Sequence, residues 1–192
     1  MSKQIDYYLT PTSPWTYLGH GRFAEIAKRH GAAVAVKPVD YGVIFPQSGG
    51  LPLAKRAPQR QAYRLLELAR WRDHLGVPLN VHPKHFPTDP APAACLISAA
   101  PEGKRMAIAG DCLCAVWAED RNIADADVVA EIAACHGIAD TAGAVARGKA
   151  IYESNTREAV ARQVFGAPTY VYRDELFWGQ DRLDFLERAL AK

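Results

Sequence analysis

A serine followed directly by a proline is the first group in this chain whose position suggests chemistry. Ser13 and Pro14 follow a short β-rich run, and the pair is typical of a helix start, with serine as the N-cap and proline in the first turn. A hydroxyl at that point lies beside backbone N–H groups that have no partner within the helix, and the helix dipole stabilises negative charge there. The local sequence by itself supports no role for Ser13 beyond capping.

The histidines argue against a hydrolytic role for Ser13. A nucleophilic serine needs a histidine base in contact with it. None of the six histidines falls in a recognisable hydrolase motif; they are His20, His30, His74, His82, His85 and His136. The spacing of His82 and His85 would suit two metal ligands, but Pro83 follows His82 and no third ligand is near. We therefore expect neither serine hydrolysis nor a bound metal.

Composition narrows the class of protein further. With 192 residues, 49% of them apolar, the chain can bury a full core as one domain or as a domain with one large insertion. The net charge is +2 and the basic residues are scattered, which argues against nucleic-acid binding. No apolar signal segment and no stretch of roughly 18 apolar residues is present, so we expect a cytoplasmic protein without membrane contact. The cysteines form no C-x-x-C pair and are interpreted as small, reduced, buried thiols: Cys95, Cys112, Cys114 and Cys135.

The N-terminal elements position Ser13 at a strand-to-helix junction. Residues 4–10 are predicted to form a strand, residues 14–30 a helix that ends at Gly31, and residues 32–40 a second strand. Residues 42–58 carry several glycines and prolines and are predicted to be a loop. The chain therefore begins with a β-α-β unit.

Helical patterns dominate the middle of the chain, and a hairpin and a helix follow. The predicted helical segments are 58–76, 91–100, 103–119, 125–136, 140–151 and 155–165. Residues 169–178 are predicted to form a β-hairpin, and residues 180–190 repeat leucine at helical spacing. The order β-α-β, helices, β-β-α predicts an α/β fold with a thioredoxin-like core (residues 1–45 and 165–192) and an all-helical insertion (residues 46–164).

Three local motifs give this order a family resemblance. Ser13 to Thr16 lie where thioredoxin-like proteins carry C-x-x-C, Phe165 to Pro168 resemble the family's cis-proline loop, and Phe177 to Leu183 resemble a strand-to-helix junction of kappa-class glutathione transferases and 2-hydroxychromene-2-carboxylate isomerases. Residues 63–79 and 82–93 resemble the isomerases more closely. The chain is thus similar to the DsbA-like branch of the thioredoxin superfamily, and to the isomerases within it.

This resemblance implies a glutathione-dependent isomerase. The family interconverts 2-hydroxychromene-2-carboxylate and trans-o-hydroxybenzylidenepyruvate in aromatic catabolism, by reversible thiolate addition. Ser13 would donate a hydrogen bond to the glutathione sulfur. The glutathione-binding residues implied are Ser13, Ala167, Pro168, Trp178, Gly179, Gln180 and Asp181. A serine cannot form a mixed disulfide, so thiol–disulfide exchange is not expected.

The substrate should be a planar aromatic carboxylate held by apolar walls and a cationic or polar anchor. The residues that would contact it are Tyr17, Lys55, Arg56, His85, Phe86 and Thr88. The resemblance also implies a homodimer.

Other interpretations remain open from the sequence. Pro168 could be a strand-edge proline, Trp178 or Tyr17 a core aromatic, and Asp181 a first-turn acid of the last helix. The substrate-contact residues could each lie in solvated loops. The whole chain could instead be a kappa-like glutathione transferase or peroxidase, or a non-catalytic thioredoxin-like binding module.

Overall fold

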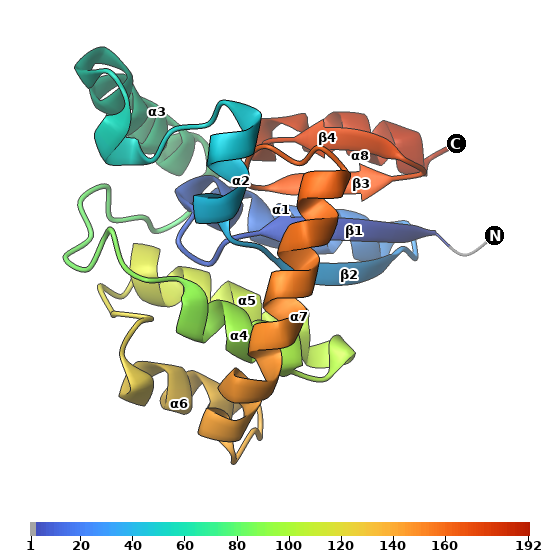
Figure 1. Cartoon of the computed structure of the whole chain (residues 1–192). Helices are drawn as coiled ribbons and strands as arrows, with labels where there is room; N and C mark the ends of the chain where they lie inside the picture. The colour runs from blue at the N-terminus through green and yellow to red at the C-terminus, as the bar shows by residue number, and fades with distance from the viewer. Residues whose placement is uncertain (1–2) are drawn as a thin grey trace.

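A four-stranded mixed sheet forms the centre of the protein. The computed structural model describes residues 3–192, and its strands are β1 (Gln4–Leu9), β2 (Ala33–Pro38), β3 (Thr169–Tyr172) and β4 (Glu175–Trp178). The strand order is β2-β1-β3-β4, with β1 parallel to β2 and antiparallel to β3. Figure 1 shows the sheet with α7 crossing one face and α1 and α8 on the other.

Eight α-helices and two short 3₁₀ turns are described around this sheet. The α-helices are α1 (Pro14–Arg29), α2 (Tyr41–Ser48), α3 (Pro58–Leu75), α4 (Ala91–Ala99), α5 (Glu102–Trp117), α6 (Ala126–Cys135), α7 (Thr141–Ala161) and α8 (Leu183–Leu190). The 3₁₀ turns are η1 (Leu53–Lys55) and η2 (Gln180–Arg182). The predicted thioredoxin-like order with a helical insertion is confirmed.

Strand β1 is buried on both faces of the sheet. Ile5, Tyr7 and Leu9 belong to the main core cluster with residues of α1 and α8, whereas Tyr8 belongs to a second cluster with residues of α2 and α7. Successive side chains of a strand point to opposite faces, so one six-residue strand supplies both cores.

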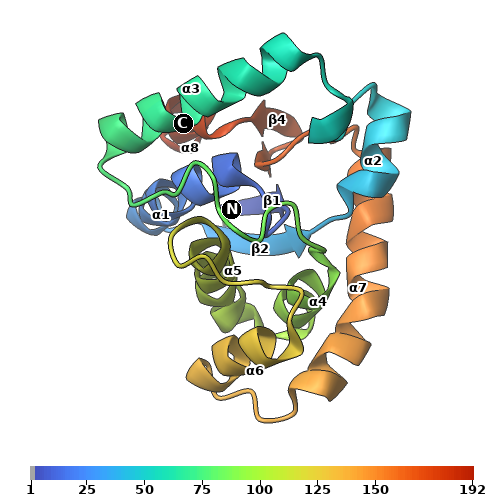
Figure 2. The same cartoon turned by 90° about the vertical axis from the view of Figure 1, so that its left-hand side faces the viewer.

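The helical insertion shares its core with the sheet. The main hydrophobic cluster contains Ile97 of α4, Trp117 of α5 and Ile132 of α6 together with the residues of β1. Figures 1 and 2 show α4, α5 and α6 beyond the β2 edge, while α3 extends over the opposite end of the sheet. The division at residues 45/46 and 164/165 stays a prediction, and its first boundary falls within α2.

A half-buried histidine links the sheet, α1 and α5. His20 Nε2 lies 3.0 Å from the Met106 carbonyl oxygen, so Nε2 carries the proton and Nδ1 accepts a hydrogen bond from the Tyr7 hydroxyl at 3.1 Å. Burial lowers the pKa of His20, although the bond to Met106 opposes this. The neutral imidazole therefore serves as a structural bridge.

The loop prediction for residues 42–58 is wrong over its first part. Helix α2 begins after Asp40, whose side chain caps it by accepting a hydrogen bond from the Gly42 N–H at 2.7 Å. Tyr41 and Ile44 are buried against residues of α7 and β1. Tertiary burial of these side chains outweighs the glycines and prolines that predicted a loop.

The predicted separation of residues 140–151 from 155–165 is also wrong, because α7 is continuous. The hydroxyl of Thr156 has both of its hydrogen bonds inside the protein. It donates to the Tyr152 carbonyl of the same helix at 2.8 Å and accepts from the Asp40 N–H at 2.9 Å. Gly148 lets the helix approach α4 closely, since a Cβ there would lie 1.9 Å from the Cys95 carbonyl oxygen. Packing against α4 and β2 thus stabilises a helix with weak local propensity.

The C-terminal hairpin was predicted correctly, whereas the prediction that all cysteines are buried was not. The hairpin is confirmed, with Arg173 and Asp174 at positive φ in its turn, and residues 180–182 form η2 ahead of α8. Cys135 is exposed, not buried as predicted. No helix within residues 3–192 has the length and apolarity required to cross a bilayer.

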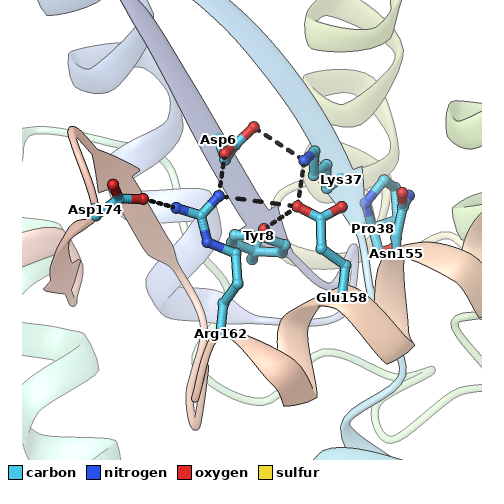
Figure 3. A network of polar contacts seen from close by, with 8 residues as sticks. All are labelled: Asp6, Tyr8, Lys37, Pro38, Asn155, Glu158, Arg162 and Asp174. Atoms are coloured by element: carbon cyan, nitrogen blue, oxygen red, sulfur yellow. Dashed lines mark hydrogen bonds and ion pairs between the residues drawn. The ribbon is translucent and has the colours of Figure 1, made fainter.

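A network of ion pairs covers the sheet beside α7 (Figure 3). Lys37 of β2 bonds to Asp6 at 2.9 Å and to Glu158 at 2.6 Å, and Arg162 bonds to Asp6 at 2.7 Å. The hydroxyl of Tyr8 donates to Glu158 at 2.7 Å. The network joins β1, β2 and the end of α7. It gives hydrogen-bond partners to charged side chains that are half-buried and to the buried Tyr8.

Replacing Glu158 by glutamine should reduce both the stability and the acid sensitivity of the protein. Burial tends to raise the pKa of Glu158, but hydrogen bonds from Lys37 and Tyr8 outweigh it, so the pKa is lowered overall. Such a carboxylate stabilises the fold above its unfolded pKa of about 4.3, and this stabilisation is lost as the pH falls through the folded pKa. We expect Glu158→Gln to lower the free energy of unfolding by about 1–2 kcal/mol near neutral pH.

Urea unfolding near neutral pH and at a pH below about 4 measures both effects. Glu153→Gln is the matched control, because Glu153 is an exposed residue of the same helix with no ion pair to any residue in 3–192. The difference between wild type and Glu158→Gln should shrink in acid. An equal difference at both pH values would contradict the assignment.

Candidate active site

The side-chain oxygen of Ser13 caps α1, and its hydroxyl proton stays available for a further hydrogen bond. Its Oγ accepts a hydrogen bond from the Thr16 N–H at 3.1 Å, as predicted for an N-cap, and Pro14 occupies the first turn. Ser13 is 8% exposed. Its O–H makes no hydrogen bond to an acceptor within residues 3–192, so the proton can be donated to a ligand. The first turn of α1 contains no acidic side chain that would oppose an anion.

The cis-proline loop lies at the same end of the two central strands as Ser13. Tyr8 pairs with Thr169 in the antiparallel ladder, so the segment before β3 runs beside the segment after β1. The Ala167–Pro168 peptide bond is cis, as the family resemblance implies. Ala167 is half-buried, and its backbone N–H and C=O make no hydrogen bond within the described chain. They can pair with an extended ligand.

Two hydroxyls and an indole hold this loop in place. Tyr41 and Thr169 each donate a hydrogen bond of 2.6 Å to the Gly166 carbonyl oxygen. The Trp178 indole packs so closely over Gly166 that a Cβ at this position would lie 2.2 Å from its Nε1. The Gly179 N–H donates to the Pro168 carbonyl at 2.9 Å, which joins the loop to the end of β4.

The turn after β4 is anchored to α1. Gly179 has φ of +104°, which an L-residue rarely adopts. Gln180 is buried, and its side-chain oxygen accepts a hydrogen bond from Arg22 at 2.9 Å. The backbone N–H groups of Gln180 and Asp181 have no backbone acceptor in the described chain. Asp181 pairs with Arg182 at 2.6 Å.

A cavity of about 650 Å³ opens between this turn, the start of α1 and helix α3. Its walls combine four aromatic side chains with several arginines. The lining residues are Trp15, Arg56, Gln59, Arg60, Tyr63, Arg64, Glu67, Trp71, Ala167, Trp178, Gly179, Gln180, Asp181 and Arg182. Figure 2 shows α3 lying across the side of the sheet at which β4 and α8 are found.

The cavity is electropositive on its α3 side. Arg64 is 9% exposed, and burial together with the nearby Arg56 lowers its pKa to about 10. It still carries a full charge at neutral pH. The two acidic residues of the lining are already paired, Glu67 with Arg70 at 2.7 Å and Asp181 with Arg182. The cavity therefore favours an anionic ligand.

The glutathione-site residues predicted from the sequence come together. Ala167, Trp178, Gly179, Gln180 and Asp181 all line the cavity, whereas Ser13 and Pro168 are buried and are not among its lining residues. Trp178 is 49% exposed, so it is not a core aromatic.

The predicted substrate residues are more dispersed. Arg56 lines the cavity, whereas the remaining five are not part of its lining. The Tyr17 hydroxyl donates to the Pro78 carbonyl at 2.5 Å, and its ring packs against the main core. The Thr88 hydroxyl donates to Asn122 at 2.5 Å. Phe86 lies beneath Arg64, Lys55 is exposed, and His85 is half-buried.

Sequence reasoning missed the face that α3 turns toward the cavity. Arg60, Arg64, Glu67 and Trp71 follow one another at intervals of three and four residues, which places them on one side of the helix. This spacing was visible in the sequence as a charged and aromatic stripe. It did not identify a site, because charged stripes on helices are usually solvated.

The four-stranded mixed sheet with its helical insertion defines a thioredoxin-like protein. The chain matches the family model of the DSBA-like thioredoxin domain over residues 4–191 and belongs to that family. It is 28% identical over 201 residues to the 2-hydroxychromene-2-carboxylate isomerase of Sphingobium xenophagum, covering 99% of both chains. The resemblance to these isomerases is confirmed.

Solved structures share the fold. A structure of 2-hydroxychromene-2-carboxylate isomerase superimposes with a TM-score of 0.86 at 24% identity, covering 98% of this chain and 94% of that one. The cytosolic disulfide reductase DsbM of Pseudomonas aeruginosa, in a structure with GSH, gives a TM-score of 0.69 at 20% identity, covering 98% and 100%.

Replacing Gly166 by alanine should displace Trp178 from the cavity wall. The new Cβ would collide with the indole, and relieving the collision should cost about 1–3 kcal/mol of stability. Urea unfolding and tryptophan fluorescence measure the two effects. Gly21→Ala in α1 is the control, since its Cβ meets nothing within 4 Å and should be neutral or stabilising by up to about 1 kcal/mol. Unchanged stability and fluorescence in Gly166→Ala would refute the packing described.

Proposed function

We propose that this protein is a glutathione-dependent isomerase that interconverts 2-hydroxychromene-2-carboxylate and trans-o-hydroxybenzylidenepyruvate. The observation that carries the proposal is one aromatic, electropositive cavity lined by Ala167 and by the Trp178–Asp181 turn. Pro168 follows Ala167 in the chain, and the N-cap Ser13 lies two residues before Trp15, which also lines the cavity. The full-length similarity to proteins named 2-hydroxychromene-2-carboxylate isomerase supports it. The fold neighbour in complex with GSH supports the choice of thiol.

The reaction requires opening of the cyclic hemiketal, which breaks the ring C–O bond and frees a phenol and a ketone, and then rotation about the conjugated double bond. Glutathione would supply a thiolate whose reversible addition turns this bond into a single bond that can rotate, and whose loss restores the double bond. A free thiol with a pKa of about 8.5 is only a few per cent ionised at neutral pH. The protein must therefore lower the pKa of the thiol and orient the sulfur.

Ser13 meets both requirements without acting as a nucleophile. Its Oγ is held in place by the Thr16 N–H, so its own proton points away from that bond and can be donated to sulfur. A charge-assisted hydrogen bond and the positive end of α1 both favour the thiolate over the thiol. The same serine thus caps the helix and binds the sulfur.

The backbone around Ala167 would align the tripeptide. Its unpaired N–H and C=O can bond to the cysteinyl unit in the manner of an added strand. The free N–H groups of Gln180 and Asp181 can receive the γ-glutamyl carboxylate, while Asp181 attracts the ammonium group. Asp181 must then share its carboxylate between Arg182 and the ligand.

Disulfide chemistry is not part of this proposal, although DsbM is a disulfide reductase. A mixed disulfide requires a thiolate that attacks sulfur, and residue 13 is serine. The cysteines of the chain lie on α4, α5 and α6. A cytoplasmic location and a homodimer stay predictions of the family resemblance.

A spectroscopic assay tests the proposed reaction. The ultraviolet spectrum of 2-hydroxychromene-2-carboxylate should change only when both protein and glutathione are present. Full activity without glutathione would refute the thiolate mechanism. Rapid turnover of chlorodinitrobenzene, with none of the isomerase substrate, would instead assign the site to a kappa-like transferase.

Replacing Ser13 by alanine should lower the isomerase rate by on the order of 10²-fold, because one preorganised donor to the reacting sulfur is lost. The pH–rate profile should shift to higher pH, since the pKa of the bound thiol rises. Stopped-flow or steady-state kinetics across the pH range measure both.

The capping role of Ser13 needs its own control. Ser13→Ala should also cost about 1 kcal/mol of stability. Ser13→Asp keeps a good cap but has no proton to donate and repels a thiolate, so it should be stable and inactive. Ser13→Thr keeps both functions. Wild-type rates in Ser13→Asp would remove the hydroxyl from the mechanism.

A further inference from the structure

Arg64 is a buried cation with no anionic partner. It lies on α3, is 9% exposed, and lines the cavity. No carboxylate or carbonyl oxygen within residues 3–192 makes an ion pair or hydrogen bond with its guanidinium. Arginines are almost never buried to this degree without a partner, because removing a charge from water is costly.

Aromatic rings position the guanidinium but do not satisfy it. The Arg64 Cζ lies 5.2 Å from the centre of the Phe86 ring and 5.7 Å from that of Trp117. Both rings can stabilise the cation through their π faces. The rings cannot accept hydrogen bonds from the N–H groups in the plane of the guanidinium. These groups donate to an atom with a lone pair in that plane, such as a carboxylate oxygen. Those donors remain available to a molecule in the cavity.

The neighbouring charges do not compensate Arg64. Glu67, on the same face of α3, is bound to Arg70, and Asp181 across the cavity is bound to Arg182. Arg56, another cation that lines the cavity, adds to the positive potential around Arg64. The site is therefore preorganised for an anion from outside the chain.

We propose that Arg64 is a specificity-determining residue that binds the carboxylate of a planar aromatic substrate. The guanidinium fork matches a carboxylate in two parallel hydrogen bonds. Trp15, Tyr63 and Trp71 line the same cavity and provide flat apolar surfaces for the ring attached to that carboxylate. This inference rests on the proposed function for the identity of the substrate, but the recognition of an aromatic carboxylate can be tested separately from the reaction.

Binding of a probe tests Arg64 without requiring catalysis. The probe is trans-2-hydroxycinnamate, an aromatic carboxylate, compared with its methyl ester by isothermal titration calorimetry on the full chain. Wild type should bind the acid about 10- to 100-fold more tightly than the ester, and Arg64→Met should abolish this preference. Arg64→Lys keeps the charge without the fork and should restore only part of it.

An arginine outside the cavity provides the matched control. Arg157 lies on α7, is exposed, does not line the cavity and makes no ion pair within residues 3–192, so Arg157→Met should keep the preference for the acid. Arg64→Met should not lower the urea midpoint, because it removes a charge that has no ion-pair partner within residues 3–192. A large loss of stability with the acid preference retained would show a structural role and overturn the proposal.

Glutathione also carries carboxylates, and its affinity separates the two sources. In each variant the dissociation constant of glutathione should stay within about twofold of wild type, while kcat/KM for the isomerase substrate falls with the loss of the acid preference. Weaker glutathione binding with unchanged probe binding would assign the anchored carboxylate to glutathione and overturn the proposal.

The remaining outcomes are also decisive. Equal binding of acid and ester by wild type, or no binding of either, would overturn the role of Arg64. Absence of isomerase activity in a wild-type protein that prefers the acid through Arg64 would refute the proposed reaction alone.

Discussion

The antiparallel pairing of β1 with β3 is the constraint on which the site depends. Tyr8 lies opposite Thr169 in this ladder, so the segment that follows β1 and the segment that precedes β3 lie at the same end of the sheet. Ser13 follows the first strand and Pro168 precedes the third. Two segments from opposite ends of the sequence thereby form one surface. The proposed function needs both segments to hold the glutathione thiol, because one offers the hydroxyl and the other the unpaired backbone.

Side-chain hydrogen bonds hold the segments at this end of the sheet in place. The Gly166 carbonyl accepts from both Tyr41 and Thr169, and Gln180 is tied to Arg22. These bonds come from α1, α2 and β3, so the loop geometry depends on both faces of the sheet. Such support by neighbouring residues is what keeps a binding surface rigid enough to orient a ligand.

The insertion contributes the second half of the cavity and most of its charge. Helix α3 brings Arg60 and Arg64 to the same cavity as Ala167 and the turn after β4, while α5 and the loop before α4 place Trp117 and Phe86 beside Arg64. An anion is thus favoured at two places: by the N-terminus of α1 and by the α3 side of the cavity. A thiolate and a carboxylate are the two anions that the proposed reaction requires.

Much of this arrangement was determined by local sequence. Ser13 and Pro14 specified the helix start, β-rich runs bounded by turn residues specified the strands, and the Arg-Asp turn specified the hairpin, because caps, strand propensity and turn residues act over a few positions. The sequence did not reveal α2, whose Tyr41 and Ile44 become buried only when α7 packs above them. It also did not reveal Arg64 as a site residue. Only the tertiary structure could do so, since burial, the partner rings and the absence of a counter-ion among the described residues are properties of the assembled core and not of the chain alone.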